Sequence, residues 1–319
     1  MTLPLSPPLA PQLALTRRAL PEGQDIAYEV KLDGFRCVAF VDGTEVFLQS
    51  RNGKPLQRYF PELLLPAGRY VLDGEIVVRG EDGREDFDAL GQRIHPAASR
   101  IELLSRQTPA RYVAFDLLAH RDTVLLELPF CERRRSLEQL LAGEGFGGTP
   151  VEMMASSNDP AQARRWLESA EGAIAKEVGA PYRPGERKGM FKVKRVRTVD
   201  AVVVGWRPGK EQDTVGALIL GLYDEGRLRV VGHCSGLSAK EKRRLVGALA
   251  PYETGERGAG EPSRWSAGRE LEWVTLRPEL VVEIEFDHVS AGRIRHGARL
   301  LRWREDKDPL ECTFAQLSA

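Results

Sequence analysis

A lysine beside an Asp-Gly pair is the feature that most constrains this chain. Lys31, Asp33, Gly34 and Arg36 fall within six positions, and residues that favour β-strands flank them on both sides. An Asp-Gly pair between apolar runs is a common hairpin turn, so the local pattern also fits a solvated lysine on a surface turn. The other interpretation is a strand-end lysine whose amine attacks a nucleotide. Motifs further along the chain favour this second interpretation.

Length and composition indicate a globular protein of two domains. The chain has 319 residues, of which 42% are hydrophobic and 29% charged, and domains usually hold about 100–200 residues. No apolar stretch approaches the roughly 20 residues of a membrane span. Residues 1–11 are rich in Pro and Leu but lack the basic start and apolar centre of a signal peptide. We therefore expect an extended N-terminal lead-in, a cytoplasmic protein and no membrane partner.

The four cysteines, Cys37, Cys131, Cys234 and Cys312, lie far apart in the sequence. No pair has Cys-x-x-Cys spacing, which argues against a zinc site and against a disulfide framework. Net charge is zero, with 46 basic and 46 acidic residues, but the region 183–197 holds seven basic residues against the single acid Glu186. A local positive strip of this kind can hold a polyphosphate or a nucleic-acid backbone.

In the first part of the chain, short strand-like runs alternate with turns and helices. Strands are predicted at 29–31, 37–41, 46–49 and 112–118, and residues 70–78 form either a strand pair or one strand broken near Asp73-Gly74. Helical patterns occupy 87–92, 129–141 and 160–168. Strands and helices without a regular βαβ repeat favour an α+β fold with antiparallel sheets.

After about residue 197 the pattern changes. Strands are predicted at 201–206, 217–223, 228–233, 281–286 and 300–303, with one helix at 238–250 that Ser238 caps. Five strands with one inserted helix fit an OB-type barrel, which is a nucleic-acid-binding architecture. The segment 253–266 is rich in Gly, Glu and Arg, and we predict a flexible surface loop there. The domain boundary is expected near residues 197–200.

Seven short motifs follow one another in a fixed order. They are Lys31-Leu-Asp-Gly-Phe-Arg36, Ser50-Arg-Asn-Gly53, Leu72-Asp-Gly-Glu75, Tyr112-Val-Ala-Phe-Asp116, Glu171-Gly-Ala-Ile-Ala-Lys176, Phe191-Lys-Val-Lys194 and Arg304-Glu-Asp-Lys307. Each is weak alone. Together they resemble the signature set of the covalent nucleotidyltransferases, which comprise ATP-dependent DNA ligases, RNA ligases and mRNA capping enzymes. The resemblance extends over about residues 3–314.

Finer features resemble one branch of this family. The segments 49–62, 92–100 and 301–313 are similar to the compact bacterial ligases of the ligase C type, relatives of the ligase domain of ligase D. The implied fold is α+β, with an antiparallel-sheet, ATP-grasp-like nucleotidyltransferase (adenylation) domain at 1–198. A C-terminal OB-fold β-barrel would follow at 199–319.

The resemblance also implies a catalytic role for Lys31. Its amine would attack the α-phosphate of ATP, form lysyl-AMP and release pyrophosphate. A free lysine has a pKa of about 10.4, and a bound metal together with Lys192 and Lys194 would disfavour the protonated amine. Those two lysines alternate along a predicted strand and so share a face. Glu75 and Glu171 match the carboxylates that support a divalent cation, Mg²⁺ or Mn²⁺.

Other positions match nucleotide contacts of the family. Glu29 matches the residue that helps to recognise the base, and Phe115 matches the aromatic that stacks on adenine, although a plain core phenylalanine is the commoner fate. Arg36 and Arg51 match arginines that contact AMP and the 5′-phosphate at a nick, a role that suits a planar donor fork. Lys176 matches a residue near the sugar and phosphates.

In the second domain, Arg304, Asp306 and Lys307 match the element that closes over the active site and orients the leaving pyrophosphate. A hinge near residues 197–200 would allow that motion. One departure from the family pattern is Met190-Phe191, where a tryptophan is expected.

The resemblance thus implies a monomeric ATP-dependent DNA ligase that seals nicked double-stranded DNA, in DNA repair, at the bacterial nucleoid. An end-binding or repair protein would assist it. An RNA ligase or a capping-type guanylyltransferase stays open as an alternative, since both share the nucleophile. A non-catalytic OB-fold nucleic-acid-binding protein is the rival from another class. An NAD-dependent ligase would need a tetracysteine zinc finger, which these cysteines do not provide.

Overall fold

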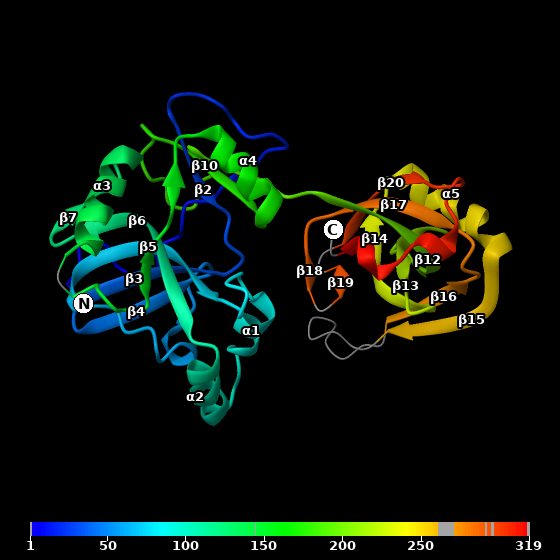
Figure 1. Cartoon of the computed structure of the whole chain (residues 1–319), viewed down its shortest axis with the longest axis horizontal. Helices are drawn as coiled ribbons and strands as arrows, with labels where there is room; N and C mark the ends of the chain where they lie inside the picture. The colour runs from blue at the N-terminus through cyan, green and yellow to red at the C-terminus, as the bar shows by residue number, and fades with distance from the viewer. Residues whose placement is uncertain (1, 144, 261–270, 291, 295–296, 318–319) are drawn as a thin grey trace. The chain divides into compact units, whose positions relative to one another are not determined.

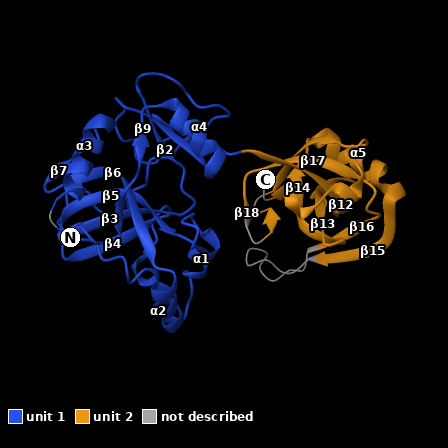
Figure 2. Ribbon diagram, viewed as in Figure 1, with its two compact units in different colours: residues 1–195 blue, residues 196–319 orange. Residues whose placement is uncertain are grey.

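The structure is a computed structural model that describes residues 2–143, 145–260, 271–290, 292–294 and 297–317. The chain divides into two compact units, residues 1–195 and 196–319 (Figure 2). Each unit has its own hydrophobic core. The chemistry predicted from the sequence uses residues of both units.

Unit 1 contains two sheets, which Figure 1 shows in blue to green. The larger has the order β4-β3-β5-β6-β7, with β8 paired to β6, and the smaller has the order β1-β11-β10-β2-β9. Most neighbours are antiparallel, as the sequence predicts, but β1–β11 and β6–β8 are parallel. The strands are β1 (Leu15–Thr16), β2 (Ile26–Val30), β3 (Phe35–Gly43), β4 (Glu45–Ser50), β5 (Gly68–Val78), β6 (Ala110–His120), β7 (Thr123–Val124), β8 (Val151–Met153), β9 (Ser156–Ser157), β10 (Gly172–Glu177) and β11 (Met190–Lys194).

Helices pack on both sheets of unit 1. Helix α3 (Phe130–Leu141) contacts β6, and α4 (Pro160–Ser169) contacts β2 and β10. Asp159 caps α4, and Pro160 at its first position has no N–H that would need a partner. The predicted helices are confirmed, with α1 at Phe87–Gln92. Helix α2 (Ala98–Gln107) was not predicted, because it has no capping side chain and buries few residues.

The disturbance near Asp73-Gly74 is not a break in the strand. β5 runs through it without interruption, so the predicted strand pair is wrong, and only the pairing with β6 shifts there. Gly74 is needed for close approach rather than for a turn, since a Cβ would lie 2.6 Å from the ring of Tyr112. Asp73 is thereby carried into the interior of unit 1.

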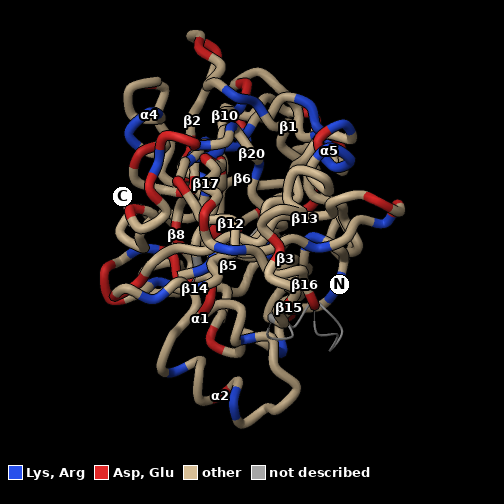
Figure 3. The backbone as a smooth tube through the Cα atoms, turned by 90° about the vertical axis from the view of Figure 1, so that its right-hand side faces the viewer, with Lys and Arg blue, Asp and Glu red and all other residues tan. Residues whose placement is uncertain are grey.

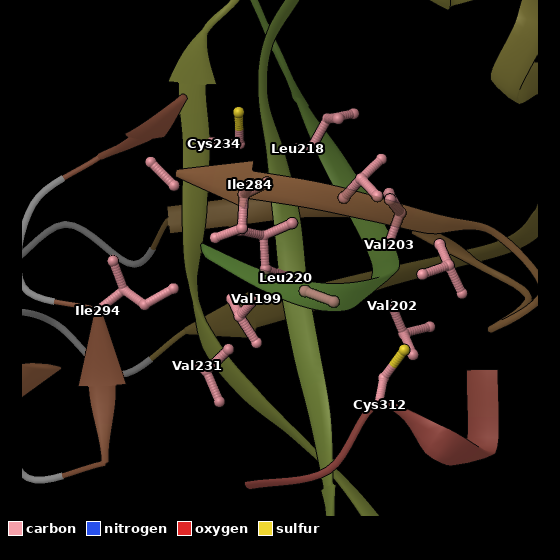
Figure 4. Packing of buried hydrophobic residues seen from close by; sticks show 14 of the residues in the cluster. Val199, Val202, Val203, Leu218, Leu220, Val231, Cys234, Ile284, Ile294 and Cys312 are labelled. Atoms are coloured by element: carbon pink, nitrogen blue, oxygen red, sulfur yellow. The ribbon is translucent and has the colours of Figure 1, made fainter. Parts of the chain in front are cut away.

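Unit 2 is built on one sheet with the order β13-β14-β20-β17-β12-β16-β15. β13 also pairs with β12, which closes the barrel predicted from the sequence. Its core includes Val199, Val203, Leu220 and Ile284 (Figure 4). The strands are β12 (Arg197–Pro208), β13 (Val215–Asp224), β14 (Arg227–Gly236), β15 (Glu253–Gly260), β16 (Leu271–Leu276), β17 (Val281–Phe286), β18 (Val289–Ser290), β19 (Arg293–Ile294) and β20 (Ala298–Trp303).

The five strands and the helix predicted in unit 2 are confirmed. Helix α5 (Ala239–Leu249) begins with a capping box in which Ser238 and Glu241 satisfy each other's backbone N–H groups. Short 3₁₀ turns lie at Gln57–Tyr59, Ala250–Tyr252, Pro309–Glu311 and Phe314–Leu317.

One expectation for this part of the chain needs correction. The surface loop predicted at 253–266 is wrong for 253–260, which form β15 and pair with β16, while 261–266 lie outside the described residues. Gly258 is required in that strand because a Cβ would lie 2.3 Å from the indole of Trp273. Residues 197–200, near which the hinge is predicted, pair with β17 inside β12, and the preceding residues 195 and 196 belong to no strand.

All four cysteines are free thiols, as predicted, and three of them are buried. Among the described residues, no helix is long and apolar enough to cross a membrane.

Candidate active site

Both sheets of unit 1 contribute to one cavity of about 220 Å³. Its wall includes the residue that follows β2, strands β3, β5 and β6, and the hairpin β10–β11. Most residues predicted for the site line this cavity, and they are Glu29, Lys31, Arg36, Arg51, Glu75, Phe115, Lys176 and Lys192. Residues as far apart in the sequence as Glu29 and Lys192, 163 positions, are thus brought to one place.

Lys31 enters the cavity directly after β2. Its backbone N–H donates to Gly172 O at 3.0 Å, which fixes the strand end beside β10. Its Nζ donates to Glu171 Oε2 at 2.5 Å, and the lysine side chain is 18% exposed. Lys194 Nζ lies 4.0 Å from the other oxygen of the same carboxylate. Glu171 and Lys194 do not line the cavity, but Glu171 contacts its central amine.

Glu75, on β5, is the second predicted carboxylate. Burial raises its pKa to about 7; Asp73 and Glu171 act in the same direction, and Arg36 and Lys31 oppose them. A carboxyl group with a pKa of about 7 is partly protonated at neutral pH, and it loses this proton when a cation binds. It therefore suits a cation site that forms only when a ligand is present.

The donor set fits a magnesium-type cation. Among the described residues, no group of three or more His, Cys, Asp or Glu side chains is placed to hold a metal. Glu75 and Glu171 would supply two carboxylates, and the remaining ligands would be phosphate oxygens and water. Mg²⁺ is commonly bound in this way, through one or two carboxylates and substrate phosphates.

Phe115 belongs both to a core and to the cavity. It is 6% exposed and packs with Val77, Val113 and Met154. The guanidinium carbon of Arg36 lies 4.5 Å from the ring centroid, and Lys176 Nζ lies 4.7 Å from it. Each of these cations is also paired with a buried carboxylate, Arg36 with Asp73 and Lys176 with Glu29, so the ring lies beside two ion pairs.

Glu29 is a buried carboxylate at the inner wall. It is 1% exposed, and its Oε2 lies 2.8 Å from Lys176 Nζ. Its Oε1 has no hydrogen-bond partner, although Arg134 Nη1 forms an ion pair with it at 3.5 Å. Burial raises the pKa of Glu29, and the neighbouring Lys176 opposes that shift. A buried acceptor without a donor is costly, so it marks a place where a ligand N–H would bind.

Lys192 stands in a group of cations at the cavity. Its pKa is lowered by burial and by Lys194, Lys31, Arg51 and Arg187. Arg187 lines the cavity as well. Elsewhere along the basic strip the charge is neutralised: Arg183 pairs with Glu127 and Lys188 with Glu186. Only part of the strip predicted at 183–197 therefore attracts anions into the cavity.

Residues 11–14 form a wall of the cavity that the sequence did not reveal. Only the first of them falls in the extended lead-in expected at residues 1–11, and no role was predicted for residues 12–14. Gln12 is 5% exposed, and its backbone N–H donates to the hydroxyl of Tyr182, 170 positions away. Contacts over that separation leave no local pattern, so no sequence signal marked this segment.

The three predicted residues near the C-terminus belong to unit 2. Arg304 forms two-pronged pairs with Asp200 and with Asp306, all at 2.9 Å. Hydrogen bonding to Arg304 lowers the pKa of Asp306 to about 2. Lys307 pairs with Glu311. The charged side chains of this motif are thus neutralised within their own unit.

Comparison with known proteins identifies the family. The model of the ATP-dependent DNA ligase domain matches residues 7–194, and that of the ATP-dependent DNA ligase C-terminal region matches 211–307. DNA ligase C1 of Mycolicibacterium smegmatis is 44% identical over 99% of this chain and 96% of its own length. DNA ligase C of Mycobacterium tuberculosis is 43% identical over the same shares.

A solved structure agrees with these matches. Mycobacterial DNA ligase D complexed with ATP is 30% identical, with a TM-score of 0.53, over 96% of this chain and 98% of that one. With this match the nucleotidyltransferase domain and the OB-fold domain predicted from the sequence are both confirmed. The chain belongs to the ATP-dependent DNA ligase family, with the bacterial ligase C and ligase D types among its relatives.

Proposed function

We propose that this protein seals nicks between a 5′-phosphate and a 3′-hydroxyl in double-stranded DNA, using ATP and a lysyl-AMP intermediate on Lys31. One observation carries the proposal. A single cavity is lined by the amine of Lys31, the partly protonated carboxyl group of Glu75, the ring of Phe115 and a cluster of cations around Lys192. A nucleotide triphosphate needs these groups together, since phosphoryl transfer depends on positioning and charge neutralisation.

The first step transfers AMP to the enzyme. The Lys31 amine attacks the α-phosphorus, a nitrogen–phosphorus bond forms, and the phosphorus–oxygen bond to pyrophosphate breaks. The amine must be neutral to attack. Glu171 Oε2 already accepts its hydrogen bond at 2.5 Å, so the departing proton has an acceptor in place. Lys192 stabilises the charge that develops on the α-phosphate oxygens.

Glu75 and Glu171 would hold the divalent cation, Mg²⁺ or Mn²⁺. When bound, this cation neutralises phosphate charge and disfavours protonation of Lys31. The two residues contribute negative charge at the cavity. Because burial raises the pKa of Glu75, part of this charge develops only when a cation binds.

The buried acceptor of Glu29 supports ATP rather than GTP. Its Oε1 lacks a donor, and the amino group at position 6 of adenine can supply one. Guanine presents a carbonyl oxygen at that position, so in the same pose two acceptors would face each other, and guanine would have to turn its N1–H or 2-amino group toward Glu29 instead. Phe115 lines the same cavity and matches the aromatic that stacks on adenine in the family. This arrangement disfavours the capping-type guanylyltransferase.

In the second and third steps, AMP moves to the 5′-phosphate, and the 3′-hydroxyl then displaces AMP. The first of these breaks the bond to Lys31 and forms a pyrophosphate linkage on the DNA; the second forms the phosphodiester. Arg36 and Arg51 would bind the 5′-phosphate. In unit 2, the basic residues of α5 (Figure 3) offer a surface for the DNA backbone; they are Lys240, Lys242, Arg243 and Arg244.

The adenylation role predicted for 1–198 would fall to unit 1, and the OB role predicted for 199–319 to unit 2. We assign the hinge to residues 195 and 196, which belong to no strand. A monomer acting in DNA repair at the bacterial nucleoid, with an end-binding protein as helper, fits the similarity to ligase D.

The test uses a duplex with one 5′-phosphorylated nick, supplied with Mg²⁺ and with ATP, GTP or NAD in turn. Sealing with ATP alone is the expected result. Transfer of GMP from GTP to the protein without sealing, sealing with NAD, or sealing of a nicked RNA strand but not of DNA would overturn the proposal in favour of a capping enzyme, an NAD-dependent ligase or an RNA ligase, respectively. Binding of nucleic acid without any nucleotide transfer would favour the non-catalytic alternative.

A further inference from the structure

Arg36 is held at the cavity by a carboxylate beneath it. Its Nε donates to Asp73 Oδ1 and its Nη2 to Asp73 Oδ2, each at 2.6 Å. Asp73 has no exposed surface, whereas the Arg36 side chain is 21% exposed and lines the cavity. A buried charge of this kind fixes its partner firmly, because moving the guanidinium would leave the carboxylate unpaired.

Asp73 is itself fixed by a second residue, Tyr182. The hydroxyl of Tyr182 donates to Asp73 Oδ2 at 2.6 Å. The ring of Tyr182 is 1% exposed and packs in a core with Val38, Phe40 and Val71. A rigid ring thus holds the hydroxyl, and through it one oxygen of the carboxylate that orients Arg36.

The same hydroxyl also anchors the N-terminal wall of the cavity. It accepts the backbone N–H of Gln12 at 2.9 Å, and Gln12 O in turn accepts Arg36 Nη2 at 3.3 Å. The side-chain amide of Gln12 donates to Lys188 O at 2.5 Å, next to Arg187. A void of about 10 Å³ at this network leaves room for no more than one water, so its geometry is tightly defined.

We propose that Tyr182 is a positioning residue for the ligase reaction, acting through Asp73 on Arg36 and through Gln12 on the wall formed by residues 11–14. The inference rests on the proposed function, since it needs Arg36 to contact the nucleotide. Tyr182 does not touch the substrate. It sets where the guanidinium stands beside the ring of Phe115, 4.5 Å away.

The variant Tyr182→Phe tests this, because it keeps the ring and removes only the hydroxyl. Asp73 then loses one donor, and Gln12 N–H loses its acceptor. Adenylation of Lys31 should fall about tenfold at saturating ATP, and the KM for ATP should rise, since small displacements of a positioning group are costly. The control is Tyr70→Phe, which removes another buried hydroxyl of unit 1, bonded to Pro66 O at 2.5 Å and outside the cavity.

Tyr182→Phe loses two hydrogen bonds and Tyr70→Phe loses one, so both variants should lose thermal stability, and Tyr182→Phe should lose more. Tyr70→Phe should leave the rate and the KM within about twofold of the unaltered protein. If Tyr182→Phe loses stability but keeps the rate and the KM within the same twofold range as Tyr70→Phe, Tyr182 is only a core residue and the inference is wrong.

A double-mutant cycle tests whether Tyr182 affects adenylation through Asp73. Asp73→Asn should reduce adenylation more strongly than Tyr182→Phe, and the combined variant should be little worse than Asp73→Asn alone, because both act on Arg36. Fully additive losses would contradict action through Asp73. The unaltered protein reports on the proposed function independently: if it forms no lysyl-AMP with ATP, the function fails, whereas normal adenylation with an inert Tyr182 overturns this inference alone.

Discussion

Lys31 Nζ donates a hydrogen bond to Glu171 Oε2 at 2.5 Å, which joins two residues 140 positions apart in the sequence. The contact is formed because β2 and β10 are antiparallel neighbours, so that the residue after one lies beside the residue before the other. Lys194 approaches the same carboxylate from β11. Three strands of the smaller sheet therefore set the charge around the reactive amine.

The first prediction concerns Glu171. Glu171→Gln keeps a hydrogen-bond acceptor but removes the negative charge that would receive the proton and help to hold the cation. Adenylation of Lys31 should fall by about 100-fold, the low end for loss of a positioned base. The rate of pyrophosphate release from ATP measures it. The matched control is Glu168→Gln, an exposed glutamate at the end of α4, which should leave the rate unchanged; equal rates in both variants would rule out this role.

The second prediction concerns pH and Glu75, whose pKa is raised to about 7, chiefly by burial. Below pH 7 the carboxyl is largely protonated in the free protein and binds a cation poorly. The Mg²⁺ concentration that gives half-maximal adenylation should therefore increase as the pH falls from 8 to 6. A concentration unaffected by pH over this range would contradict the assignment of Glu75 to the cation.

The same shift has a consequence for stability. Since the folded-state pKa lies above the usual value of 4.5, the folded protein holds this proton more tightly than the unfolded chain. Stability associated with it is complete below pH 4.5 and is lost as the pH rises through 7. Glu75→Gln should thus raise the free energy of unfolding at pH 8 by about 1–2 kcal/mol, and the gain should shrink toward pH 4.5. Denaturant unfolding at several pH values measures it.

The third prediction concerns Arg304 in unit 2. If its motif acts on the leaving pyrophosphate, Arg304→Ala should slow adenylation of Lys31 at least tenfold and spare sealing of a nick that already carries AMP. Arg302→Ala is the control, because that arginine is 61% exposed and forms its ion pair with Glu283 rather than with the motif. Equal losses on the two substrates in Arg304→Ala would point to a structural role through Asp200 instead.

The sequence predicted most elements of the fold where apolar periodicity was strong, as in the barrel strands around Val203 and Leu220. The predictions were wrong at two glycines that are needed for close packing rather than for a turn. Gly74 lies against Tyr112 and Gly258 against Trp273, so one strand was divided and another was interpreted as a loop. These requirements come from partners distant in the chain, which a local pattern does not contain.

The candidate site shows a similar limit. The positions that carry motifs could be named because charged and aromatic residues recur in a family-like order, and the structure gathers Lys31, Glu75 and Phe115 at one cavity. Gln12 and Tyr182 carry no such motif. Their importance lies in hydrogen bonds to each other and to Asp73, which become visible only when the N-terminal segment is seen to cross the larger sheet's core.

The most direct measurement asks whether Lys31 carries AMP. The protein is incubated with Mg²⁺ and ATP labelled at the α-phosphate, then denatured, and the retained label is counted for the unaltered protein, Lys31→Ala and the control Lys54→Ala, an exposed lysine. The account predicts acid-labile label on the unaltered protein and on Lys54→Ala, none on Lys31→Ala, and sealing of a pre-adenylated nick by all three. Label retained on Lys31→Ala would contradict the account.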